Sequence, residues 1–338
     1  MAMFDKLLAN LKASKKTIVF TEGTDARVLY AADRLLKEEL MGVILCGEPG
    51  EVKKAAADGG FDIEKATILD PLGYDGMEEL VAKMVEIRKG KMTEDECRDL
   101  LKKSNYFGTM LVKMGKADAL LGGATYSTAD TVRPALQIVK TKKGSSLVSS
   151  SFILFREKDG KDETIAMGDC AINLRYEDKL DKEGNVVQTG AQQLAEVAVE
   201  TARTAAFFGI DPKVAVLSFS TYGSGKGGTV QLSHDAVIEA RKLDPELTID
   251  GEFQFDAAVS AEVAKTKCPD SKVAGQANTF IFPMIEAGNI GYKIAQRLGG
   301  FEAYGPILQG LNAPINDLSR GCNAEEVYKM AIITAGMA

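Results

Sequence analysis

The stretch Thr17-Ile18-Val19-Phe20-Thr21-Glu22-Gly23-Thr24-Asp25 sets the pattern that decides the fold. Its first four residues favour a buried strand, and Asp25, at the end of the loop that follows, is a good helix N-cap. After Asp25, apolar residues recur on one face of a helix: Val28, Leu29, Ala32, Leu35 and Leu36. A strand, a short loop and an amphipathic helix in this order indicate one unit of a parallel α/β sheet.

The same alternation continues along the chain. Apolar runs at 42–47, 66–69 and 117–121 predict further strands, and 77–88 predicts a long helix. Residues 142–151, rich in Lys, Gly and Ser, indicate a crossing into a second domain. That domain is expected to open with strands at 151–155 and 164–167 around a charged turn, followed by a helix at 193–208 and a strand at 213–219. We therefore expect an α/β protein of two domains with mostly parallel sheets.

Composition excludes several classes of function. The chain has 338 residues, 45% of them hydrophobic and 26% charged, which is typical of a soluble globular protein. A net charge of −7 with interleaved signs argues against non-specific binding of nucleic acid or membranes. The five cysteines lack a CxxC pair and His234 is the single histidine, so we expect reduced cytoplasmic thiols and no metal centre. No apolar run approaches the ~18 residues of a membrane span, and no signal peptide is evident.

The run Asn316-Asp317-Leu318-Ser319-Arg320-Gly321-Cys322-Asn323-Ala324-Glu325-Glu326 carries the strongest chemical signal. It places a hydroxyl, a guanidinium and a thiol just before an apolar-periodic helix at 327–335. Helix entrances favour anions, and an arginine fork matches phosphate or carboxylate. Asn323 and Glu326 also fit a capping pair, so helix capping alone is a competing interpretation for Glu326.

Two further loops follow predicted strands. Residues 126–134 bring several hydroxyls and Arg133 to a helix entrance, where capping and anion binding are equally good interpretations. Residues 218–228 match G-x-G-x-x-G at their glycines but fail as a Walker A loop, which leaves a flexible phosphate-binding loop with Lys226 or a mobile connection. Arg27 and Arg88 are each, taken alone, more typical of solvated charges.

The chain resembles the phosphate acetyl/butyryltransferase family, and phosphate acetyltransferases in particular, in six motifs that occur in order over nearly its whole length. The motifs are Ser127-Thr128-Ala129-Asp130-Thr131-Val132-Arg133-Pro134-Ala135-Leu136-Gln137, Gly168-Asp169-Cys170-Ala171, Leu217-Ser218-Phe219-Ser220-Thr221, Gly251-Glu252-Phe253-Gln254-Phe255-Asp256-Ala257-Ala258, Gly288-Asn289-Ile290-Gly291-Tyr292-Lys293 and the run from Asn316 to Cys322.

This resemblance implies two α/β/α domains with an isocitrate/isopropylmalate dehydrogenase-like topology and a cleft between them. Domain I would comprise 1–146 plus the returning segment 306–338, and domain II would comprise 147–305. The resemblance further implies a homodimer whose substrates are coenzyme A, acetyl phosphate and phosphate, with no additional cofactor.

The resemblance also assigns roles to residues. Arg320 would grip the phosphoryl group and Ser319 would donate to the oxygen of the tetrahedral intermediate. Glu326 would deprotonate the coenzyme A thiol, in a position where the family usually has Asp. The expected substrate-binding residues are Arg133, Ser127, Thr128, Thr131, Arg27, Arg88 and Cys170.

The expected reaction is direct attack of the coenzyme A thiolate in a ternary complex. An acyl-enzyme on Cys170 or Cys322 is the alternative mechanism. Competing functions are transfer of a longer acyl group such as butyryl, an NAD-dependent hydroxyacid dehydrogenase suggested by the glycines at 223–228, and a non-catalytic coenzyme A or phosphate sensor.

Overall fold

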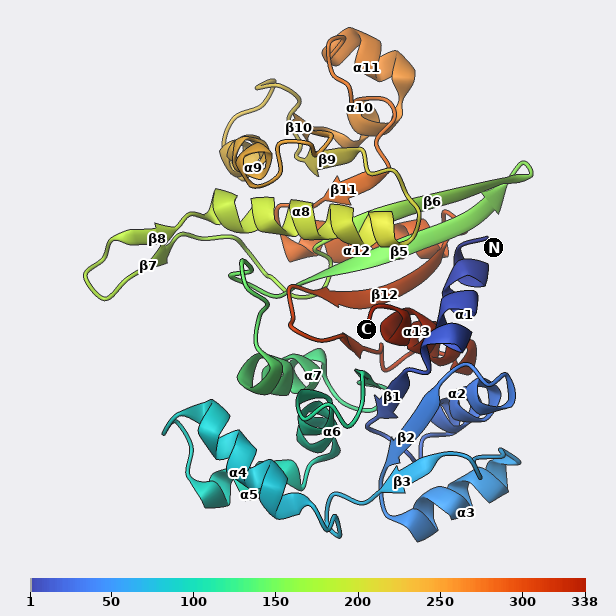
Figure 1. The fold of residues 1–338 in the computed structure, drawn as a ribbon. Coiled ribbons are helices and arrows are strands. Elements are labelled where there is room, and N and C mark those ends of the chain that lie inside the picture. The colour runs from blue at the N-terminus through green and yellow to red at the C-terminus, as the bar shows by residue number, and fades with distance from the viewer. Residues whose placement is uncertain (1) are drawn as a thin grey trace. The chain divides into compact units, whose positions relative to one another are not determined.

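The computed structural model describes residues 2–338, with side chains from Leu7 onward. The chain forms two compact units (Figure 1). Unit 1 comprises the residues up to Lys143 together with Leu311–Ala338, and unit 2 comprises Gly144–Gly310. Each unit contains helices and a sheet whose strands are mostly parallel, which confirms the predicted fold class. The dehydrogenase-like topology and the interdomain cleft stay predictions.

The sheet of unit 1 is entirely parallel, in the order β13-β4-β1-β2-β3. Its strands are β1 (Thr17–Phe20), β2 (Gly42–Cys46), β3 (Thr67–Leu69), β4 (Ala119–Gly122) and β13 (Ile315–Asp317). Phe20 is in register with Leu121 of β4, and Gly122 is in register with Asp317 of β13. The carboxyl ends of these strands therefore share one edge of the sheet, where loops can carry ligands.

Helices cover both faces of this sheet. The helices are α1 (Ala2–Ser14), α2 (Ala26–Lys37), α3 (Pro49–Gly59), α4 (Met77–Arg88), α5 (Glu94–Leu101), α6 (Ser104–Lys113), α7 (Thr128–Pro134) and α13 (Ala324–Gly336), with a π-helix at Ala135–Val139. Val19 packs in the core with α4, α5 and α6. Its neighbours Ile18 and Phe20 point to the opposite face, because side chains alternate along a strand.

Unit 2 has a six-stranded sheet in the order β10-β9-β11-β6-β5-β12. Its strands are β5 (Ser149–Lys158), β6 (Lys161–Gly168), β9 (Val214–Leu217), β10 (Ile249–Phe253), β11 (Thr279–Ile281) and β12 (Glu302–Gln309). The β5–β6 hairpin and β12 pair antiparallel, and the other pairs are parallel. Because β12 pairs with β5 along most of its length, unit 2 extends through Gly310, whereas the predicted boundary at 305/306 would divide this strand.

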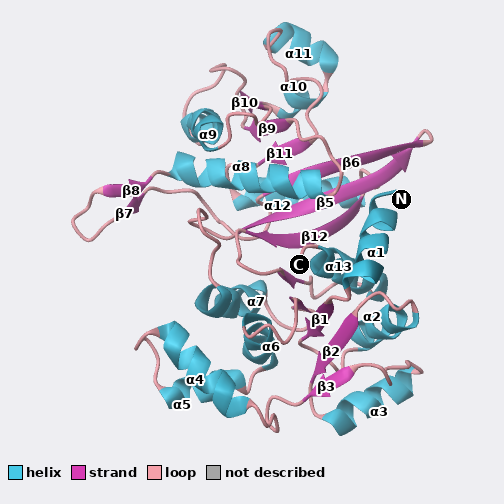
Figure 2. Ribbon diagram, viewed as in Figure 1, coloured by secondary structure: helices cyan, strands magenta, loops and turns pink. Residues whose placement is uncertain are grey.

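The remaining elements of unit 2 are mostly helices (Figure 2). They are α8 (Gly190–Phe207), α9 (Val230–Leu243), α10 (Phe255–Val259), α11 (Ala261–Lys267) and α12 (Ile285–Arg297). A small antiparallel hairpin of β7 (Lys179–Leu180) and β8 (Val186–Gln188) precedes α8. Within residues 2–338, no helix is both long and apolar enough to cross a membrane.

Candidate active site

The turn between β13 and α13 carries Ser319 and Arg320. The Cys322 N–H donates to the Ser319 carbonyl at 2.9 Å, and the Gly321 N–H donates to Ser319 Oγ at 3.3 Å. The Ser319 hydroxyl thus accepts from its own turn and keeps its proton available to a ligand. Both Ser319 and Arg320 are exposed.

The helix after this turn begins with the predicted capping pair. Asn323 Oδ1 accepts the Glu326 N–H at 2.8 Å, and Glu326 Oε2 accepts the Asn323 N–H at 3.0 Å. This reciprocal arrangement is a capping box, so the structural interpretation of Glu326 is confirmed. The side chain is half-buried, and its Oε1 makes no hydrogen bond to any residue that the structure describes. A catalytic role for Glu326 stays a prediction.

Arg27, in the first turn of α2, is committed to protein groups. Its Nε and Nη2 form a two-point contact with Asp25 at 2.9 and 2.7 Å. Its Nη1 donates to the carbonyls of Arg320 and Cys322 at 2.9 and 3.1 Å, and Nη2 also donates to the Ala124 carbonyl at 2.9 Å. Arg27 therefore joins the entrance of α2, the loop after β4 and the turn before α13.

Arg133 and Arg320 differ from Arg27 in this respect. Both are exposed, and within residues 2–338 neither guanidinium has a hydrogen bond or an ion pair. Arg133 lies in the last turn of α7. Two uncommitted guanidinium groups suit the binding of phosphate oxygens.

Arg88 and Arg133 both lie near Tyr106. Arg88 Nη1 donates to the Gln137 carbonyl at 3.4 Å, and the Tyr106 hydroxyl donates to Gln137 Oε1 at 3.1 Å. Burial raises the pKa of Tyr106, and the positive charges of Arg133 and Arg88 oppose that rise. The structure thus brings two of the predicted arginines to one part of unit 1.

The hydroxyls at the entrance of α7 are paired with carboxylates. Ser127 Oγ donates to Asp130 Oδ2 at 2.6 Å, Thr128 Oγ1 donates to Asp317 Oδ2 at 2.6 Å, and Thr131 Oγ1 donates to Asp317 Oδ1 at 2.5 Å. Ser127 is the N-cap, and α7 begins at Thr128. Thr131 is only 2% exposed, so its hydroxyl serves Asp317.

Two acids at this edge of the sheet were not predicted as site residues. Asp317 is 1% exposed, and burial raises its pKa to about 6 although Thr128 and Thr131 oppose the rise. Glu22 follows β1 and accepts the N–H groups of Gly123 and Thr125, and burial raises its pKa as well. The available signal was their position, since Asp317 ends a strand of the parallel sheet and Glu22 lies two residues after the end of another.

The cysteines are all buried and free. Burial raises the pKa of Cys322 to about 11, despite the opposing charge of Arg27. Burial also raises the pKa of Cys170 well above its usual value, with Asp169 adding to the rise. Because the thiolate is the nucleophile, both groups are poorly suited to forming an acyl-enzyme at neutral pH. Cys170 follows β6 in unit 2, whereas the other predicted site residues lie in unit 1.

The glycine-rich loop of unit 2 is anchored by a buried carboxylate. Glu252 accepts the Ser220 hydroxyl at 2.8 Å and the Gly223 N–H at 2.7 Å. Burial alone would raise its pKa, but these donors reverse the shift and the pKa is lowered. His234 Nδ1 lies 3.5 Å from Oε2 of Glu252, so the single histidine contacts the carboxylate that anchors this loop. Across residues 2–338, no group of three or more His, Cys, Asp or Glu side chains is arranged to hold a metal ion.

Comparisons with known proteins identify the family of the chain. The family model "Phosphate acetyl/butaryl transferase" matches residues 2–335. The chain is 50% identical to a phosphate acetyltransferase of Bacillus subtilis over 336 residues, which cover 99% of each protein. It also resembles the crystal structure of a phosphotransacetylase from Streptococcus pyogenes, with a TM-score of 0.91 and 51% identity, covering 99% of this chain and 97% of that one.

A more distant structure shares the fold alone. It is a branched-chain phosphotransacylase from Enterococcus faecalis, with a TM-score of 0.63 and 17% identity, covering 95% of this chain and 99% of that one. The match along the whole chain and the identity of about half its residues to a curated relative place the protein unambiguously: it belongs to the phosphate acetyl/butaryl transferase family.

Proposed function

We propose that this protein is a phosphate acetyltransferase, which transfers an acetyl group reversibly between coenzyme A and inorganic phosphate. The observation that carries the proposal is the turn Ser319–Cys322. It presents a serine hydroxyl and an uncommitted guanidinium, while Arg27 holds its backbone carbonyls. The names of the relatives at about half identity support the acetyl group as the substrate.

In the proposed reaction the coenzyme A thiolate attacks the carbonyl carbon of acetyl phosphate. The C–S bond forms, and the carbonyl electron pair moves to oxygen, where the Ser319 hydroxyl donates a hydrogen bond. The oxyanion then collapses, the C–O bond to phosphate breaks, and phosphate leaves with its charge held by Arg320 and Arg133. One preorganised donor to such an oxyanion typically stabilises the transition state by about 3 kcal/mol.

Glu326 is the proposed base. A simple thiol has a pKa of ~8.5, so a positioned carboxylate assists formation of the thiolate near neutral pH. The capping box occupies Oε2 of Glu326 and fixes the side chain, while Oε1 can accept the thiol proton. The raised pKa values of Cys170 and Cys322 support direct transfer over an acyl-enzyme.

The substrate-binding roles follow the resemblance. Arg88 and Arg133 are proposed to hold the phosphates of coenzyme A or acetyl phosphate, which their common position near Tyr106 supports. Arg27, whose N–H groups are committed, is proposed to act on substrate through the turn that it holds. Ser127 and Cys170 complete the proposed set, and Thr128 and Thr131 are proposed to act on substrate through α7, which their hydrogen bonds to Asp317 hold in place.

A homodimer in the cytoplasm is also proposed. Unit 2 carries a mostly apolar groove of about 990 Å³, with Phe219, Phe255 and Ile294 on its wall. These three side chains are 59%, 49% and 54% exposed, and a groove walled by exposed apolar side chains suits a contact with a second copy of the chain. Five free thiols suit a reducing compartment.

The decisive experiment measures thioester formation from acetyl phosphate and coenzyme A, and in parallel from butyryl phosphate. We expect a higher kcat/KM for the acetyl substrate. Preference for butyryl phosphate would favour the longer-chain alternative, because the fold is shared with a branched-chain phosphotransacylase and does not by itself fix acyl length. Turnover with neither substrate would contradict the proposed function and favour a silent sensor.

A further inference from the structure

Asp317 occupies a special place in unit 1. It is the last residue of β13, two positions before Ser319, and it is in register with Gly122 at the carboxyl end of β4. The Leu318 N–H donates to the Gly122 carbonyl at 2.7 Å, so the chain is held by the sheet until just before the turn. Because only Leu318 separates Asp317 from Ser319, a shift of Asp317 would also move Ser319 and Arg320.

The Asp317 carboxylate receives two hydroxyls from α7. Thr128 bonds one oxygen and Thr131 bonds the other, from positions 189 and 186 residues away in the sequence. The carboxylate lies so close to Gly123 that a Cβ added there would approach Oδ1 to 2.2 Å, and Gly123 also has a φ of +96°. Glycine at 123 is thus required for the carboxylate to reach α7.

The direction of these hydrogen bonds limits what the threonines can do. A hydroxyl has one proton, and both protons here point to Asp317, which leaves only lone pairs for other partners. Phosphate oxygens need donors, so Thr128 and Thr131 are poorly placed to bind phosphate while this contact holds. Their hydroxyls instead fix α7, which carries the uncommitted Arg133 in its last turn.

We propose that Asp317 is a positioning residue that clamps the entrance of α7 to the end of β13 and thereby sets the spacing between Arg133 and the Ser319–Arg320 turn. This proposal rests on the proposed acetyl transfer, because the spacing matters only if both arginines hold one phosphorylated substrate. Misplacing a substrate group by about 1 Å can lower a rate by 10²-fold.

The ionisation of Asp317 supports a functional role. The titratable groups that face it are Glu22 from the segment after β1, Asp130 from α7 and Tyr126 from the loop between β4 and α7. On the side of α13, the hydroxyl of Thr334 accepts a hydrogen bond from the side-chain amide of Asn316, the residue before Asp317. Burial raises the pKa of Asp317 to about 6, so its charged form opposes folding at neutral pH.

This leads to a separation of stability from activity. An acid whose folded pKa lies above its unfolded value of 3.8 weakens the fold as pH rises between those two values. Asp317→Asn removes that unfavourable charge, so the variant should be at least as stable as the wild type at pH 8. The amide keeps one acceptor oxygen and places an NH2 donor at the position of the other, so only one of the two hydroxyls can still donate to it and the clamp should loosen.

The test measures kcat and KM for acetyl phosphate and coenzyme A, together with the unfolding temperature, in wild type and Asp317→Asn. We expect kcat/KM to fall about 10²-fold with no loss of unfolding temperature at pH 8. We also expect the wild-type activity to decline as pH falls through about 6, where Asp317 becomes protonated, and this decline should be absent from the variant. Asp118→Asn, which removes a carboxylate before the amino end of β4, is the matched control and should keep the wild-type rate.

The outcomes are distinguishable. A wild type that transfers no acetyl group contradicts the proposed function and the clamp with it. An active wild type with an Asp317→Asn variant of equal kcat/KM and equal pH profile overturns the clamp alone. If Asp317→Asn fails to fold, Thr128→Val and Thr131→Val remove the same hydrogen bonds from the other side. Loss of kcat in the folded valine variants supports the clamp, and unchanged kcat overturns it.

Discussion

The entrances of α2 and α13 carry the same residue type in opposite states. At α2, the N–H groups of Arg27 are committed to Asp25 and to the carbonyls of Ala124, Arg320 and Cys322. At α13, the guanidinium of Arg320 has no hydrogen bond to any described residue. Position at a helix entrance therefore does not by itself make an arginine a ligand-binding group. What distinguishes the two is whether the protein has already used its donors.

Replacing Arg320 by alanine should have the largest effect on activity. We expect kcat/KM to fall about 10³-fold, because the leaving phosphate loses the preorganised positive charge of the guanidinium that neutralises it. The unfolding temperature should stay at the wild-type value, since the side chain is exposed. Initial rates of thioester formation and a thermal melt provide the two measurements.

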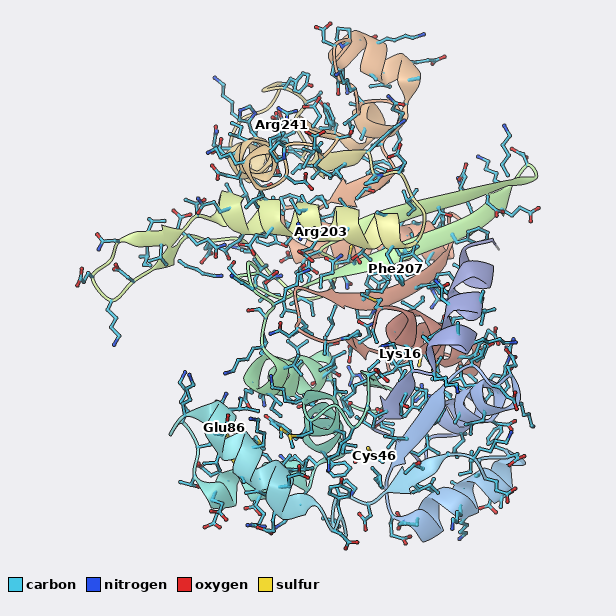
Figure 3. All side chains as sticks on the ribbon, viewed as in Figure 1. Lys16, Cys46, Glu86, Arg203, Phe207 and Arg241 are labelled. Carbon is cyan, nitrogen blue, oxygen red and sulfur yellow. The ribbon has the colours of Figure 1, made fainter. Side chains whose placement is uncertain are left out.

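Arg203→Ala is the matched control for this variant. Arg203 is an exposed arginine on α8 of unit 2, where it pairs with Glu200 (Figure 3). Its removal should leave kcat/KM unchanged. An Arg320→Ala enzyme with nearly wild-type rates would contradict this prediction, because an uncommitted arginine would then be no better a sign of function than a committed one.

Glu326→Gln separates the two roles of Glu326 at the entrance of α13, helix capping and proton transfer. Glutamine at this position can still accept the Asn323 N–H, so the capping box and the stability should be kept. A glutamine cannot take a proton from the thiol, so kcat should fall about 10²-fold. Steady-state rates and the unfolding temperature, measured on the same preparation, test both statements.

Glu325→Gln serves as the neighbouring control. Its carboxylate pairs with Arg34 of α2 at 2.8 Å and has no part in the proposed chemistry. If both glutamine variants keep wild-type kcat, Glu326 is a capping residue alone and the base lies elsewhere.

Local elements were the part of the structure that could be predicted from the sequence. The strand Thr17–Phe20 and the helix Met77–Arg88 have the predicted bounds, because both depend on short-range periodicity. The Asn323–Glu326 capping box is likewise a four-residue pattern. Such features are contained within a few residues of chain, so one sequence is enough to find them.

Long-range hydrogen bonding could not be predicted in the same way. The contacts from Thr128 and Thr131 to Asp317, and from Arg27 to the turn before α13, join residues separated by more than 180 positions. Sequence spacing carries no information about which hydroxyl will be used by which carboxylate. The resemblance to a family indicated the right loops, but not that several of their donors are already committed.

Replacing Arg27 by alanine should have the smallest effect on the chemistry and the clearest effect on stability. The change leaves three carbonyl acceptors without the guanidinium and Asp25 with only the backbone N–H of residue 27, which should lower the free energy of unfolding by about 2 kcal/mol. We expect kcat/KM to fall only about tenfold, through the loosened turn. Arg27→Lys keeps the charge but not the fork, and should recover part of the stability.

The pH dependence of the stability lost in Arg27→Ala identifies the cause of that loss. The hydrogen bond from Arg27 lowers the pKa of Asp25 below its usual value of 3.8, although burial opposes the shift. A carboxyl with a lowered pKa stabilises the fold above its unfolded pKa, and that contribution is lost as pH falls through the folded value. The difference in stability between wild type and Arg27→Ala should therefore be full at pH 7 and shrink below about pH 4. If kcat/KM instead falls as far as in Arg320→Ala while stability at pH 7 is unchanged, the Arg27 guanidinium releases its hydrogen-bond partners in the protein and binds substrate.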